Sequence, residues 1–202
     1  MALRPERGFS LLELVVVIVL ISVLLAIAIE RLLIIKAQAE RTAKEQVLGN
    51  LRSATTSRLA EMAVRSKLAD IGGLARSNPM KLLAERPQNY LGELFGPDAS
   101  SLEGGNWYFD SRAGVLCYLV ESVEYFETRL AQPPRACYVM EVVFEDINHN
   151  GQYDPGTDQL RGLRLATMQA YAWNIRYIWS GWWGSASTGS TASGEAAQNN
   201  RR

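Results

Sequence analysis

A long apolar run near the start of the chain constrains the fold more than any other feature. Residues 9–29 read FSLLELVVVIVLISVLLAIAI and include one charged residue, Glu13. As an α-helix this run rises about 30 Å, which matches the hydrocarbon core of a bilayer. Arg4 and Arg7 precede it, so the positive-inside rule places the N-terminus in the cytoplasm and the chain after Ile29 outside. The sequence therefore predicts a single-pass membrane protein.

Two simpler interpretations of this run fit less well. A secretory signal peptide has a shorter apolar region, of about 7–15 residues, and ends at a small-x-small cleavage site that is not clear here. A plain signal anchor explains the length and the orientation but not Glu13. A carboxylate in lipid costs about 3 kcal/mol unless it finds a partner. The position of Glu13 therefore indicates a specific role.

The residues around Glu13 form a motif. Residues 8–14 read GFSLLEL and follow a short basic leader. This segment closely resembles the prepilin leader of the type IV pilin and type II secretion pseudopilin superfamily. The resemblance implies that a prepilin peptidase cuts between Gly8 and Phe9 and methylates the new amine of Phe9. It also implies that Glu13 is the glutamate through which subunits of the family assemble.

The chemistry of this motif suits assembly rather than catalysis. Cleavage creates a cationic amine on Phe9, close to the Glu13 carboxylate in the sequence. In a growing filament that carboxylate can pair with the amine of a neighbouring subunit, in surroundings of low dielectric constant. Many major pilins carry a proline where this chain has Glu30, and no proline occurs between Phe9 and Asn78. This departure favours a continuous helix and a minor pilin or pseudopilin.

Composition and periodicity divide the rest of the chain. Residues 30 to about 71 are helix-compatible, with apolar residues at three- and four-residue steps, and Gly72-Gly73 should end the helix. The apolar stripe is expected to pack on a sheet. The charged residues are expected to form a solvated or subunit-facing side, and they are Lys36, Glu40, Arg41, Lys44, Glu45 and Arg52.

Strand patterns begin at Asn106, after an irregular stretch with one short helix expected at 80–85. Residues 106–110 and 114–122 predict a hairpin, and 137–146 alternates between apolar and acidic residues. Weaker strands are expected at 160–168 and 170–179. One long helix followed by four or five antiparallel strands makes an α+β fold, which resembles the ladle shape of pilins.

Five segments are therefore expected along the chain. They are a leader over 1–8, the transmembrane half of the stem helix over 9–29, its periplasmic half over 30–71, a globular head over 72–183 and a disordered tail over 184–202. The tail is expected from its composition of Gly, Ser, Thr, Ala and Asn.

One loop of the head has the pattern of a calcium site. Residues 146–158 read DINHNGQYDPGTD, with oxygen-bearing side chains at alternate positions before a glycine, as in the first half of an EF-hand loop. The predicted ligands are Asp146, Asn148, Asn150, Gln152 through its carbonyl, Asp154 and Asp158. Several pseudopilins resemble this in carrying a structural calcium. The alternative is an Asx-rich hairpin turn without an ion.

The two cysteines, Cys117 and Cys137, lie on neighbouring predicted strands. A disulfide between them would persist in an oxidising periplasm. The alternative is a pair of ordinary buried thiols, because the sequence does not give their separation.

Composition excludes several classes of function. Lys plus Arg and Asp plus Glu each number 21, so there is no basic field for nucleic acid. One His and two Cys cannot form a zinc cluster, and no set of nucleophile, base and orienting residue is present. An enzyme is therefore not expected.

The expected function is structural. The resemblance implies a minor pilin or pseudopilin of a type IV pilus or type II secretion machine, anchored in the bacterial inner membrane with a periplasmic head. After assembly it would lie in a periplasmic or cell-surface filament. Its partners would be the prepilin peptidase, other pilin or pseudopilin subunits, the inner-membrane assembly platform and the lipid bilayer. The alternative is a membrane-anchored periplasmic calcium-binding or adhesive module that does not polymerise.

Overall fold

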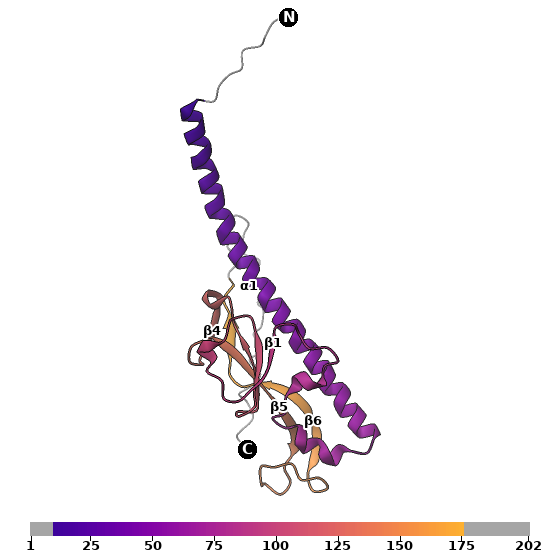
Figure 1. Ribbon diagram of the computed structural model, residues 1–202. Coiled ribbons are helices and arrows are strands. Elements are labelled where there is room, and N and C mark those ends of the chain that lie inside the picture. The colour runs from indigo at the N-terminus through magenta and orange to yellow at the C-terminus, as the bar shows by residue number, and fades with distance from the viewer. Residues whose placement is uncertain (1–9, 176–202) are drawn as a thin grey trace, which may run out of the picture.

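One long helix precedes every other element. The computed structural model describes residues 10–175, and in it α1 runs without a break over Leu11–Val64. The predictions for Gly8, Phe9 and residues 176–202, including the tail, lie outside the described residues. The N-terminal half of α1 projects beyond the head and is long and apolar enough to cross a membrane (Figure 1). The continuous helix agrees with the absence of proline.

The end of α1 comes earlier than expected. Ser66 has a left-handed backbone, with φ of 55°, and its N–H donates to the carbonyl of Ala63 over 3.2 Å. The N–H of Lys67 donates to the carbonyl of Met62 over 2.9 Å. These two bonds make a Schellman motif, which satisfies the last carbonyls of a helix. The prediction of a break at Gly72-Gly73 is therefore wrong, and both glycines lie in the 3₁₀-helix η1, Leu68–Leu74.

The head is built on a mixed five-stranded sheet in the order β1-β2-β3-β5-β6. A separate two-stranded sheet pairs β4 with β7. The strands are β1 Tyr90–Leu94, β2 Trp107–Asp110, β3 Val115–Leu119, β4 Phe126–Thr128, β5 Arg135–Glu145, β6 Gln159–Thr167 and β7 Tyr171–Trp173. Three further 3₁₀-helices connect them: η2 Pro79–Leu82, η3 Ala99–Ser101 and η4 Val123–Tyr125.

Most of the strand predictions are confirmed. β2 and β3 form the expected antiparallel hairpin, and β5 and β6 pair antiparallel along their length. Two strands were not expected. β1 runs parallel to β2 at the edge of the sheet, and β4 pairs only with β7. The short helix expected at 80–85 is a single 3₁₀ turn that begins one residue earlier and ends at Leu82, and Asn78 caps the N–H of Met80.

The sheet separates two apolar clusters. Alternate residues of β3 point to opposite faces, so Leu116 and Tyr118 pack with Leu48 and Leu51 of α1. Val115, Cys117 and Leu119 point the other way. That second face is covered by Ala99 of η3 and by loop residues such as Leu102 and Leu130. As expected, the apolar stripe of α1 packs on a sheet. Both faces of that sheet are buried.

The turn between β2 and β3 leaves no room for a side chain at Gly114. Gly114 has φ of 66°, and a Cβ there would lie 2.8 Å from Cβ and 3.0 Å from the carbonyl oxygen of Arg76. We expect Gly114→Ala to lower the free energy of unfolding by about 3 kcal/mol, since it combines a left-handed backbone with overpacking. Gly49→Ala is the control, because Gly49 is helical and nothing lies within 4 Å of its added Cβ. It should stabilise the chain by about 1 kcal/mol. Urea unfolding measures the free energy of unfolding of both variants. Equal changes in the two variants would contradict the close contact at Gly114.

Candidate functional site

Glu13 lies in the first turn of α1 and is exposed among apolar side chains. Within the described part of the chain it forms no ion pair. A carboxylate near a helix N-terminus is favoured by the helix dipole, but this does not repay its transfer into lipid. Glu13 thus lies in the segment that is apolar enough to cross a membrane and has no partner among residues 10–175.

Two charged residues of α1 that were expected to face solvent or other subunits instead face the head. The Lys44 side chain is fully buried, and its ammonium donates to Tyr171 Oη at 2.7 Å and to Tyr138 Oη at 3.4 Å. The ammonium also lies 4.0 Å from the centre of the Tyr171 ring and 3.1 Å from Glu45 Oε1. For Lys44 the prediction is wrong, because these polar and aromatic partners compensate the cation for the loss of water.

Glu40 is the second of these residues. Its carboxylate accepts three hydrogen bonds, from the hydroxyl of Tyr118 at 3.1 Å and from the backbone N–H groups of Glu121 and Ser122 at 2.7 and 2.8 Å. One turn earlier, Lys36 pairs with the Glu121 carboxylate at 2.6 Å, while both side chains remain about half exposed. The expectation of a solvated side is therefore wrong for Glu40, which is half-buried. It does hold for the exposed Arg41, Glu45 and Arg52.

The two phenols around these charges stay protonated. Burial raises the pKa of Tyr138 far above its usual range, and the adjoining Tyr171 raises it further. Burial, followed by the negative charge of Glu40, raises the pKa of Tyr118 in the same way. Burial and the charge of Glu40 therefore both favour the protonated form of Tyr118, which donates its hydrogen bond to Glu40.

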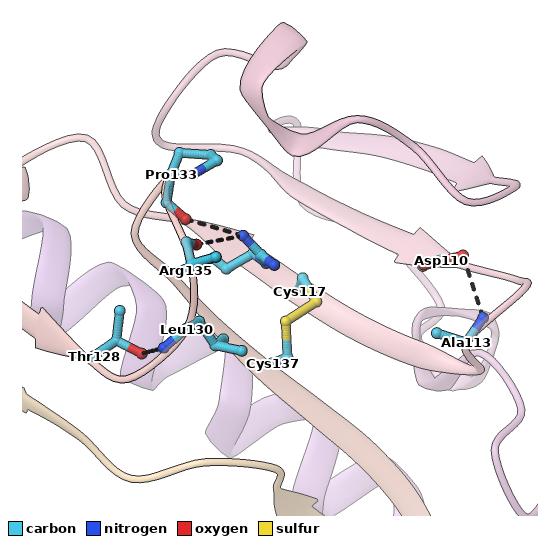
Figure 2. Close-up of a disulfide and its surroundings, with 9 residues drawn as sticks. Asp110, Ala113, Cys117, Thr128, Leu130, Pro133, Arg135 and Cys137 are labelled. Atoms are coloured by element: carbon cyan, nitrogen blue, oxygen red, sulfur yellow. Dashed lines mark hydrogen bonds between the residues drawn. A yellow bond between two sulfur atoms is a disulfide. The ribbon is translucent and has the colours of Figure 1, made fainter.

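Cys117 and Cys137 are joined by a disulfide (Figure 2). They are register partners on β3 and β5, with Cα atoms 4.1 Å apart, and both are buried on the sheet face opposite α1. Beside the bridge, the Arg135 guanidinium donates to the carbonyls of Ala131 and Pro133 (Figure 2). The bridge therefore joins two central strands of the sheet beneath the loop that precedes β5.

Removing this bridge should weaken the head. The cysteines are separated by 20 residues, and closing a loop of that size stabilises a protein by about 3 kcal/mol. We expect the Cys117→Ala, Cys137→Ala double variant to lose this amount in urea unfolding. Wild-type protein treated with a thiol reductant should unfold at nearly the same urea concentration as the variant. Identical unfolding of oxidised and reduced wild type would contradict a bridge in solution.

The loop at 146–158 satisfies its polar groups internally. Asp146 accepts from the N–H groups of Asn150 and Gly151, at 3.2 and 2.7 Å. Asp154 Oδ2 accepts from the side-chain amides of Asn148 and Asn150, at 2.7 and 2.6 Å. These bonds have the form of an Asx-rich turn. His149 is exposed and has φ of 58°, and its side chain forms no hydrogen bond with another residue of the loop.

The remaining predicted ligands complete this turn. Asp158 accepts from the N–H groups of Ile147 and Asp154, at 3.0 and 2.7 Å, and the N–H of Gln152 donates to Asn150 Oδ1. Within residues 10–175 no group of three or more His, Cys, Asp and Glu is placed to hold a metal ion. Asn148 and Asn150 direct side-chain N–H groups to Asp154 here, so binding of calcium would require both amides to turn their oxygens inward.

A titration tests the calcium prediction. Calcium at roughly millimolar concentration, the range of weak extracellular sites, is expected to raise the Tm of the chain, and magnesium is not. Asp154→Asn keeps the shape of the side chain but removes its charge, so it should abolish the rise. A Tm that does not respond to calcium would identify the loop as an ion-free turn.

The comparison with known families concerns the N-terminus. The model of the prokaryotic N-terminal methylation motif matches residues 3–29, which include Gly8, Phe9 and Glu13. No curated protein and no solved structure matches the chain. The matched residues lead directly into the apolar half of α1, and a mostly antiparallel sheet follows that helix. The chain thus carries the prokaryotic N-terminal methylation motif followed by a long apolar helix, as in type IV pilin-like proteins.

Proposed function

We propose that this protein is a structural subunit of a filament that is assembled from the bacterial inner membrane. It would be a minor pilin or pseudopilin of a type IV pilus or a type II secretion machine. The observation that carries the proposal is the methylation motif at residues 3–29, joined to a helix that continues without a break to Val64. A continuous helix gives a filament subunit one rigid axis that connects its membrane segment to its head.

The chain would be processed at its N-terminus and held at the inner membrane. The prepilin peptidase would cut after Gly8 and methylate Phe9, and the assembly platform of the inner membrane would add the subunit to its neighbours. The head would lie in the periplasm, where the Cys117–Cys137 bridge is stable. Glu13 would pair with the amine of an adjacent subunit. No catalytic role is proposed for any residue.

Fractionation tests this function. In cells that express the prepilin peptidase and a pilus or pseudopilus system, the processed subunit should be recovered with filaments sheared from the cells. The matched control is Gly8→Val, which should block cleavage and keep the chain in the membrane fraction. A membrane-anchored module that does not polymerise would remain in the membrane fraction with or without this substitution, and that result would overturn the proposal.

A further inference from the structure

We propose that Lys36, Glu40 and Lys44, here called the charged stripe, form a register clamp that fixes the position of the head along and around α1. The three residues are spaced by four, so they lie along one side of the helix. Their charges alternate in sign, and each contacts a different group of the head. These three contacts all lie at the end of the interface that is nearer the apolar half of α1.

The apolar contacts between α1 and the head are one part of what selects the register. Leu48 and Leu51 are fully buried against the sheet, but hydrophobic burial is non-directional. A shift of α1 by four residues, about 6 Å along its axis, would bring Lys44 or Arg52 to the place of Leu48 and Val47 or Thr55 to the place of Leu51. The apolar pattern opposes such a shift, and the directional contacts of the charged stripe oppose it further, since buried polar groups supply such specificity in other proteins.

The partners of the charged stripe differ in charge and in whether they donate or accept hydrogen bonds. Lys36 faces the Glu121 carboxylate, which is an anion. Glu40 faces hydrogen-bond donors only, namely the Tyr118 hydroxyl and the N–H groups of residues 121–122. Lys44 lies between the oxygens of Tyr138 and Tyr171, here called the tyrosine pair, which are joined to each other at 2.8 Å. The sequence of partners along α1 is therefore anion, donors and then acceptors.

A slip by one turn in either direction breaks every one of these contacts. In one direction Lys36 would meet the backbone donors and Glu40 would enter the aromatic surroundings of the tyrosine pair. In the other direction Lys44 would meet the donors and Glu40 would face the Glu121 carboxylate. The first slip sets the Lys36 cation against N–H groups that only donate. The second slip brings two carboxylates together and sets Lys44 against the same donors, and both arrangements are costly. The alternation of sign is thus a device against the neighbouring registers.

This clamp acts as a set of positioning residues for assembly. Glu13 and the head are on the same helix, so a fixed register gives every subunit the same orientation of the head relative to Glu13. This consequence rests on the proposed function. The register itself does not, because it depends only on contacts within one chain.

The test is a distance measurement within the full-length chain in detergent. Ala43 of α1 and Glu124 of η4 are both exposed, and cysteines placed there can carry two spin labels. The only native cysteines are bridged to each other, so they do not react with the label. Wild type should give a single distance by pulsed electron paramagnetic resonance. Glu40→Lys should add a second population, displaced by about one helical turn, or about 6 Å.

Charge swapping provides the matched control. Lys36→Glu places two carboxylates together at a half-exposed site, where the fold tolerates substitution, and should broaden the distance distribution. Adding Glu121→Lys should restore the wild-type distribution, because it restores opposite charges. A purely stabilising role would change the Tm of these variants without changing the distances, and that result would overturn the clamp. Failure of the double variant to restore the distances would overturn it as well.

The outcome is independent of filament formation. If the subunit never enters a filament but shows the predicted distances, the proposed function fails and the clamp stands. If filaments form normally and the Glu40→Lys distances match wild type, the clamp alone fails.

Discussion

Glu13→Gln is expected to reduce incorporation of the subunit into filaments at least about tenfold, while membrane insertion and cleavage remain intact. Glu13 lies in the apolar half of α1, which is long enough to cross a membrane, and it has no partner among residues 10–175. Pairing with a neighbour's amine would recover much of the roughly 3 kcal/mol that an isolated charge costs in lipid, and about 1.4 kcal/mol corresponds to a factor of ten. The amide cannot neutralise the amine of the neighbour, so each new subunit would leave a buried cation unpaired.

The measurement compares sheared filaments with total membranes by quantitative immunoblotting. Glu30→Gln is the matched control, since Glu30 is an exposed carboxylate on the same helix but follows the apolar run. This variant should enter filaments at nearly the wild-type level. Equal incorporation of both variants would contradict the assigned role of Glu13. Loss of cleavage in Glu13→Gln would also contradict it, because the substitution would then act on processing.

Lys44→Ala is expected to lower the free energy of unfolding of the head by about 4 kcal/mol. The substitution removes a fully buried aliphatic chain, which leaves a cavity next to the tyrosine pair. The hydrogen bonds of the ammonium add little to this loss, because the cost of burying the cation largely offsets them. Urea unfolding followed by tryptophan fluorescence measures the loss, because Trp107 is buried in the head.

Lys44→Met separates the contribution of side-chain volume to stability from the contribution of charge. Methionine fills nearly the same space, and the tyrosine pair can still bond to itself. Replacing a buried ion by an apolar group of similar size is often nearly neutral, so this variant should remain within about 1 kcal/mol of wild type. Equal losses for Lys44→Ala and Lys44→Met would show that the charge, and not the packing, supplies the stability. A free energy of unfolding that is unchanged in Lys44→Ala would contradict the buried position of Lys44.

The sequence was sufficient to predict the α+β architecture. Apolar length and the absence of proline predict the continuous helix, and strict alternation predicts β5. Both patterns are local, and each is strong enough to set the structure by itself. The expected disulfide partners also follow from the predicted strands, since Cys117 and Cys137 lie on β3 and β5, which pair in the sheet.

Other features depend on contacts between distant residues. Ser66 ends α1 in a conformation that glycine usually supplies, so the sequence indicates no break there. β1 has an irregular register around Gly92, whose φ is 104°, and β4 has only three residues. Neither strand alternates apolar and polar residue types in its sequence, so each is defined by the partner that it meets in the folded head.

The residues of the candidate site also differ in how far the sequence alone predicts them. Glu13 is found from a short contiguous motif, whereas Glu40 and Lys44 resemble any charged helix surface until the head is placed against them. Their partners lie about 80 to 130 residues away, on β3, β5 and β7. The one available signal is the alternation of charge at four-residue steps from Lys36, which the sequence also permits in a solvated helix.

The mass of the mature N-terminal peptide is the most direct test of the central claim. Membranes from cells that express the prepilin peptidase should yield a chain that begins at Phe9 with a methylated amine. The Gly8→Val variant should yield the uncleaved N-terminus from the same cells. An intact N-terminus in the wild-type protein would contradict the account, and it would identify the chain as an anchored module that does not assemble.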